Sequence, residues 1–239
     1  MKKEKSITQA LMDYALENDN SSRDDEWCEL VLSSEDSGAK KEELSLHFLG
    51  YDKVPGKHGF DGKCKKTGLY VEVKSERTTV NGNSGHWAYG NNTAKTFESK
   101  IEKDTIQVQS TFTRAGRLIA MLRYNTFDSE IPKMIKEFLS KKKKEKDNKT
   151  ETKTNFKGTH TSFKNAKSLE VLYYNPKYSD ELTSTYKKLI EDTLKANKIK
   201  ELEEMSDEDL DKLWSKNERE DKISFLAKKQ VALDNAIRA

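Results

Sequence analysis

One short segment, HGFDGKCKKTGLYVEVKSE at residues 58–76, constrains the fold of this chain most. FDGKC and GLYVEVKS have the composition and alternation of β-strands, and KKTG between them reads as a turn. If those four residues form the turn of an antiparallel hairpin, Asp61 lies opposite Glu72. Lys74 follows two residues later in the strand, so its side chain points to the same face as that of Glu72. The sequence therefore predicts two carboxylates and one ammonium group on one face of a hairpin.

The chemistry of such a group favours a metal site. Two carboxylates a few ångströms apart repel each other unless a cation or a proton lies between them. Magnesium prefers carboxylate oxygens together with water and substrate phosphate. A lysine beside that ion can orient or deprotonate water and offset charge that builds up on phosphorus. Asp61, Glu72 and Lys74 thus favour metal-assisted phosphodiester hydrolysis over acyl or glycosyl transfer, while Val71 and Val73 are apolar enough to be buried on the opposite face.

An acid two residues before a lysine is by itself a weak signal in this chain. The pattern occurs again at Glu98–Lys100, Asp147–Lys149 and Glu151–Lys153, in helical or lysine-rich surroundings. Glu72–Lys74 differs because it lies in a strand rich in Val and Tyr and is preceded by Gly-Phe-Asp-Gly. The alternative is a surface hairpin that carries a salt bridge.

Composition sets broad limits on the fold. Of the 239 residues, 36% are charged and 33% hydrophobic, which predicts one aromatic-rich core under a charged surface. Residues 133–153 hold nine Lys against four acids, so this segment either meets a phosphate backbone or is a solvated surface. Two cysteines in unlike contexts argue against a disulfide scaffold and a zinc site. Because the chain shows neither a signal peptide nor a membrane-spanning run, we expect a cytoplasmic protein with no membrane partner.

The order of patterns predicts an α/β fold with a central mixed β-sheet flanked by helices. Three helices precede the hairpin, and a long polar loop, RTTVNGNSGHWAYGNNTAK, follows it. TIQVQSTF, GRLIAMLRYN and SLEVLYYN read as further strands, and IPKMIKEFL reads as a helix before a loose lysine-rich segment near 141–160. We expect a core at 1–178 and a helical C-terminal region at 179–239.

The hairpin motif resembles the PD-(D/E)xK nuclease superfamily. Phe60-Asp61 stands where the family often has Pro-Asp, and Glu72-Val73-Lys74 matches the second half of the motif. The resemblance covers about residues 38–124 and implies a restriction-endonuclease-like core. It also implies that Asp61 and Glu72 are Mg²⁺ ligands in a metal site that includes Val73, and that Lys74 positions the attacking water. Cleavage would leave a 5′-phosphate and a 3′-hydroxyl.

The same resemblance predicts a further acid from the helix before the hairpin. Glu42 and Glu43 are the candidates, and Glu43 is preferred because it adjoins the apolar stripe of Leu44 and Phe48. Size and the absence of any ATP-binding motif are similar to those of a type II restriction endonuclease, which implies a homodimer that cuts double-stranded DNA at specific sites. The alternatives are a repair, recombination or mobile-element nuclease with the same core, or a non-catalytic DNA-binding protein.

Candidate DNA-contacting residues lie mostly in the polar loop after the hairpin. Asparagine can pair with adenine edges, and aromatic side chains can stack on bases or wedge between them. An ordinary polar loop without a binding role is equally compatible with this composition. The candidates are His58, Asn83, His86, Trp87, Tyr89, Asn91 and Gln107.

Overall fold

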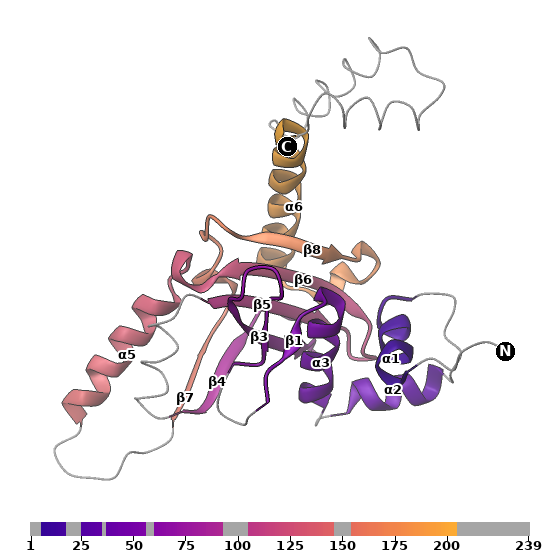
Figure 1. Cartoon of the computed structure of the whole chain (residues 1–239), viewed down its shortest axis with the longest axis horizontal. Coiled ribbons are helices and arrows are strands. Elements are labelled where there is room, and N and C mark those ends of the chain that lie inside the picture. The colour runs from indigo at the N-terminus through magenta and orange to yellow at the C-terminus, as the bar shows by residue number, and fades with distance from the viewer. Residues whose placement is uncertain are drawn as a thin grey trace. The chain divides into compact units, whose positions relative to one another are not determined.

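The computed structural model describes residues 6–17, 25–34, 37–55, 60–92, 105–145 and 154–204. The chain divides into two compact units, Met1–Leu189 and Ile190–Ala239. This division falls later than the predicted boundary after residue 178. The first unit is an α/β assembly whose elements are shown in Figure 1. No helix among the described residues has the length and apolar character that crossing a membrane requires.

A six-stranded mixed sheet forms the centre of the first unit, in the order β1-β2-β3-β5-β6-β8. Only β3 and β5 run parallel among these neighbours, and the other pairs are antiparallel. This confirms the predicted mixed sheet flanked by helices. The strands are β1 (Asp52–Lys53), β2 (Gly62–Lys63), β3 (Tyr70–Arg77), β5 (Thr105–Phe112), β6 (Leu118–Asn125) and β8 (Glu170–Tyr174).

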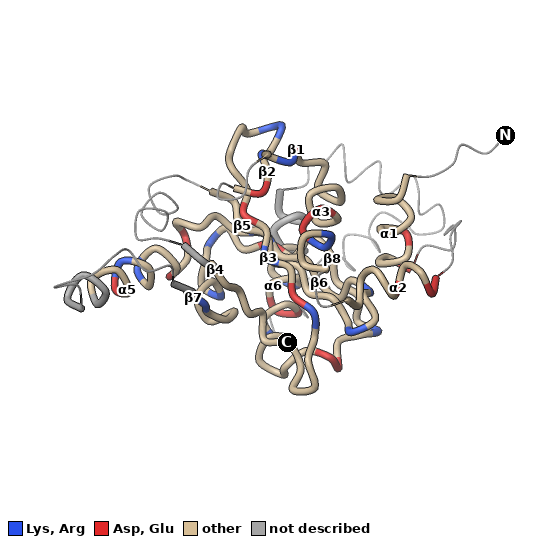
Figure 2. Tube along the Cα trace, turned by 90° about the horizontal axis from the view of Figure 1, so that it is seen from below, with Lys and Arg blue, Asp and Glu red and all other residues tan. Residues whose placement is uncertain are grey.

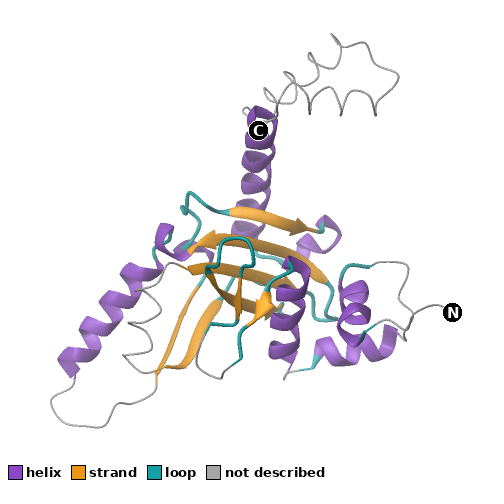
Figure 3. Ribbon diagram, viewed as in Figure 1, coloured by secondary structure: helices purple, strands orange, loops and turns teal. Residues whose placement is uncertain are grey.

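Three helices precede the sheet: α1 (Ile7–Ala15), α2 (Asp25–Ser33) and α3 (Gly38–Leu49). Helix α3 packs on β3, as Figure 3 shows, and it ends where Gly50 adopts a left-handed conformation with φ of 63°. Leu44 and Leu46 of α3 join Val71 and Val73 of β3 in the main hydrophobic cluster. The odd-numbered residues of β3 therefore face the helices, which leaves its even-numbered residues on the opposite face.

The segment predicted as a polar loop after β3 contains a strand instead. Strand β4 (Trp87–Asn92) pairs antiparallel with β7 (Thr154–Gly158) in a separate two-stranded sheet. Trp87 and Tyr89 are 1% and 3% exposed, and Trp87 packs on Phe156 with 5.3 Å between ring centroids. The local composition predicts a loop because glycine and asparagine surround these aromatic residues. In the structure, burial of the aromatic side chains favours a strand instead.

The remaining helical elements come after β6 and after β8 in the chain. They are η2 (Thr126–Asp128), α5 (Ile131–Glu145), η3 (His160–Ser162), η4 (Pro176–Glu181) and α6 (Ser184–Glu204). The prediction of a loose segment near 141–160 is wrong at both ends, because α5 includes residues 141–145 and β7 begins at Thr154. Residues 146–153 lie outside the described part of the chain.

Candidate active site on the β2–β3 hairpin

The hairpin has the register that the sequence predicts. Gly62 pairs with Val71 and Lys63 pairs with Tyr70, so extending the register by one residue places Asp61 across from Glu72. Asp61 Oδ2 accepts a hydrogen bond of 2.7 Å from the backbone N–H of Val73. This bond fixes the Asp61 carboxylate against the middle of β3.

Glu72 and Lys74 form a close ion pair on the face of β3 that is turned away from α3. Their side chains are 6% and 14% exposed, and Lys74 Nζ lies 2.5 Å from Glu72 Oε1. Burial tends to lower the pKa of Lys74, but the carboxylates of Glu72, Asp61 and Glu42 outweigh it and raise that pKa above its usual value. Lys74 is therefore a fixed ammonium ion among acids.

Glu42, and not Glu43, approaches this group from α3. Burial raises the pKa of Glu42 to about 7, with further upward contributions from Asp61 and Glu72 and a downward one from Lys74. Glu43 instead accepts hydrogen bonds from Thr8 Oγ1 at 3.1 Å and from Lys40 Nζ at 3.2 Å. The preference for Glu43 was therefore wrong in its geometry, because helical rotation carries the next residue toward α1.

Three acids thus act electrostatically on a single ammonium ion, and Glu72 also bonds to it directly. Figure 2 shows acidic positions before β2, on β3 and on α3 in the same part of the fold. Glu42 and Asp61 are partly exposed, whereas Glu72 is buried. Burial, and after it the negative charge of Asp61 and Glu72, raises the pKa of Glu42 to about 7. The same negative charge would attract a divalent cation to the exposed side of the group.

The donor atoms suit a hard cation that keeps several waters. Among the described residues, no three His, Cys, Asp or Glu side chains are close enough to hold a metal ion together. Asp61 and Glu72 could supply two carboxylates, as in Mg²⁺ sites that are completed by water and phosphate. The Val73 side chain is a hydrocarbon without a donor atom, so Val73 could contribute only its carbonyl oxygen; in an extended strand this points to the same side as its N–H, where Asp61 lies.

Comparison with known proteins assigns no role to the acids and the lysine on the hairpin. No protein-family model matches the sequence, and no curated protein does.

Most of the side chains predicted to contact DNA are buried inside the protein, where they bond to other side chains. Trp87 donates a hydrogen bond of 2.7 Å from Nε1 to Ser162 Oγ, and Tyr89 donates one of 2.9 Å from its hydroxyl to Gln107 Oε1. Gln107 and Asn83 are 0% and 2% exposed. These four side chains therefore cannot reach base edges in this conformation, and the prediction is corrected for them.

Of the other three residues predicted to contact DNA, one is exposed and the side chains of two lie outside the described structure. His86 is exposed, with a side-chain exposure of 52%, and lies 3.8 Å from Glu76 Oε2 through Nδ1. Asn91 belongs to β4, but its side chain is outside the described residues, as is all of His58. His86 alone among the seven is placed at the surface of the described structure.

Sequence reasoning missed Glu76, which shares a strand face with Glu72 and Lys74. Burial raises its pKa to about 7, and the Asn83 side chain opposes that shift weakly by donating a hydrogen bond of 3.4 Å. The period of two along β3 could have indicated this residue, because positions 72, 74 and 76 alternate with buried or small residues. Its contacts with Asn83 and His86 come from the segment between β3 and β4, whose position beside β3 the sequence pattern did not reveal.

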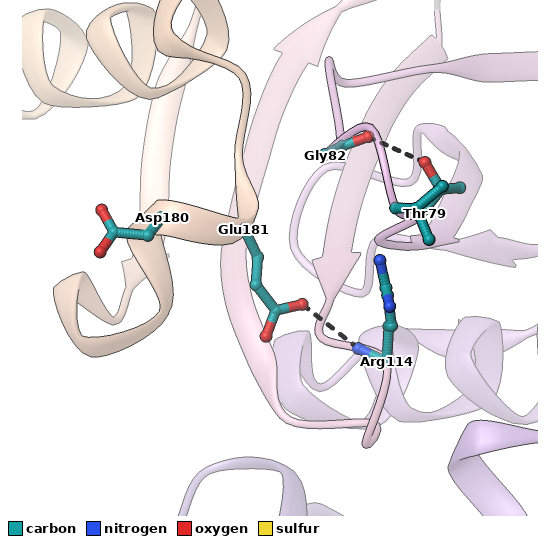
Figure 4. A pocket seen from close by; sticks show the side chains of 6 residues that line it. Thr79, Gly82, Arg114, Asp180 and Glu181 are labelled. Atoms are coloured by element: carbon teal, nitrogen blue, oxygen red, sulfur yellow. Dashed lines mark hydrogen bonds between the residues drawn. The ribbon is translucent and has the colours of Figure 1, made fainter.

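A separate polar pocket of about 340 Å³ lies beyond the end of β3. Figure 4 shows Arg114 between Thr79 and Glu181, with Asp180 directed away from them. Glu181 Oε2 accepts hydrogen bonds from Thr78 Oγ1 and from the Arg114 backbone N–H. The residues that line the pocket include none of the hairpin acids, so we assign the candidate chemistry to the hairpin.

Proposed function

We propose that this protein is a magnesium-dependent DNA endonuclease with a restriction-endonuclease-like core. The observation that carries the proposal is the convergence of Glu42, Asp61 and Glu72 on one fixed ammonium ion, Lys74. Acid groups around a lysine on a strand of the central sheet suit phosphodiester hydrolysis, because phosphate oxygens and a divalent cation can meet there.

Each residue has a distinct part in this proposal. Asp61 and Glu72 would hold Mg²⁺, and the Val73 carbonyl would be a further oxygen donor. When bound, the ion supplies Lewis acidity and lowers the pKa of water. Lys74 orients the attacking water and offsets negative charge that develops on the phosphate. Glu42 takes up or releases a proton near neutral pH at the exposed side of the group.

The more specific parts of the proposal rest on the resemblance of Phe60-Asp61 and Glu72-Val73-Lys74 to the PD-(D/E)xK motif. They are double-stranded DNA as substrate, site-specific cleavage of the type II kind, 5′-phosphate and 3′-hydroxyl ends, and a homodimer. The geometry on the hairpin supports hydrolysis of a phosphodiester, and the motif supports the choice of DNA.

The decisive experiment incubates purified protein with plasmid and phage DNA in Mg²⁺ or in EDTA. Lys74→Ala should abolish cleavage, and Lys177→Ala, which removes a 62% exposed lysine from η4, should retain it. Discrete bands that require Mg²⁺ would support site-specific restriction. A smear or degradation from ends would favour the repair, recombination or mobile-element alternative. DNA binding without cleavage in any condition would overturn the enzymatic proposal.

A further inference from the structure

The Lys74 ammonium has a second partner besides Glu72. Its Nζ lies 4.8 Å from the centre of the Tyr89 ring, over the ring face. The two partners come from different sheets, because Glu72 is on β3 and Tyr89 is on β4. An aromatic face attracts a cation through the ring quadrupole, and the attraction grows where water is excluded. Lys74 is therefore held between a carboxylate and a ring.

Tyr89 is itself fixed on several sides. It is 3% exposed, its hydroxyl donates to Gln107 Oε1 at 2.9 Å, and its ring makes an edge contact with Trp87 at 5.5 Å. Burial raises the pKa of Tyr89 well above its usual value, with Glu72 and Asp61 contributing in the same direction. The ring is thus a neutral, immobile surface that lies close to both hairpin acids.

We propose that Tyr89 is a positioning residue for Lys74, acting through its ring face. This inference rests on the nuclease function proposed above. A lysine has a flexible four-carbon stem and loses rotamer freedom when its ammonium is fixed. The ring holds Nζ beside Glu72 before substrate binds, so less ordering is needed when the attacking water is oriented. Strand β4, which lies outside the motif, would thereby complete the site.

The proposal distinguishes the ring from the hydroxyl. Tyr89→Phe keeps the aromatic face and loses the bond to Gln107, whereas Tyr89→Leu loses both. We expect kcat to fall about tenfold in Tyr89→Leu and less than about threefold in Tyr89→Phe, with the KM for plasmid DNA unchanged in both. Phe156→Leu is the matched control, because Phe156 pairs with Tyr89 in the β4–β7 register and is also a buried aromatic; it should retain kcat.

A spectroscopic measurement tests the contact without requiring any cleavage. In ¹H–¹³C spectra of the full-length protein, the Lys74 Cε signal is assigned by its loss in Lys74→Ala. Stacking over the Tyr89 ring should shift its protons upfield of those of exposed lysines, in the wild type and in Tyr89→Phe. The shift should disappear in Tyr89→Leu.

The outcomes separate this inference from the proposed function. Absence of an upfield shift in the wild-type protein would overturn the inference even if Tyr89→Leu fails to fold. Equal losses of kcat in the phenylalanine and leucine variants would also overturn it, because the hydroxyl would then be the group that matters. An upfield shift in a protein that cuts no DNA would retain the contact with Lys74 and reject the nuclease function.

Discussion

Glu76→Gln should make the folded protein more stable at alkaline pH and leave it unchanged in acid. The Glu76 side chain is 31% exposed, and burial raises its pKa from 4.5 to about 7. The folded state therefore holds the Glu76 proton more tightly than the unfolded chain does. As pH rises from about 4.5 to about 7, ionisation of this carboxyl group progressively lowers the free energy of unfolding. Above about pH 7 the whole of this destabilisation is present. A neutral glutamine avoids the cost.

The size of the effect follows from the pKa difference and the exposure. A difference from 4.5 to about 7 corresponds to about 3 kcal/mol, at about 1.4 kcal/mol for each pKa unit. Water reaches 31% of the side chain and screens part of the cost, so we expect about 1–2 kcal/mol. Asn83 Nδ2 donates to Glu76 Oε2 at 3.4 Å, and the glutamine oxygen can accept the same bond.

Urea denaturation of the wild type and the variant at about pH 4 and about pH 8 measures this difference directly. Glu137→Gln on the exposed side of α5 is the matched control for losing one negative charge. A gain of the same size at both pH values would refute the reasoning, because it would come from packing and not from ionisation. A loss at about pH 8 would mean that ionised Glu76 has a stabilising partner in the folded protein.

Three further predictions concern the hairpin and its neighbours. Glu42→Gln should reduce Mg²⁺-dependent cleavage about tenfold or more, whereas Glu43→Gln should retain it in the same assay, and equal losses would contradict the assignment of Glu42. Lys74→Ala should lower the free energy of unfolding by about 3 kcal/mol without metal, because it removes the ammonium group that offsets the charge of the buried Glu72 carboxylate. Millimolar Mg²⁺ should restore part of that loss in thermal melts, and no recovery would argue against a cation site. Gly62→Ala should destabilise the fold by about 1–3 kcal/mol in urea, because its Cβ would lie 2.5 Å from Leu46 Cδ2 and 3.0 Å from the Asp52 carbonyl oxygen; an unchanged midpoint would show that the Leu46 side chain can turn away at little cost.

Local sequence pattern was sufficient for most strands of the central sheet and for the hairpin register, but not for β4 and β7. The pairing of Gly62 with Val71 follows from the length of the KKTG turn and the alternation along GLYVEVKS, both of which are short-range features. The same alternation predicted that Glu72 and Lys74 share a face, and the 2.5 Å contact between them confirms it. In contrast, the parallel pairing of β3 with β5 joins residues that are distant in the chain, and no local pattern specifies it.

The sequence by itself determined the hairpin, the three helices before it and the placement of Asp61 across from Glu72, because turn length and periodicity act over a few residues. Tertiary structure alone decided that Glu42 and not Glu43 meets the hairpin acids, since both residues precede Leu44 on the same helix and only packing fixes its rotation. It also decided that Tyr89 is a buried partner of Lys74 and not a surface contact for DNA. Burial of β4 against the central sheet depends on long-range packing, and long-range packing leaves no local signature.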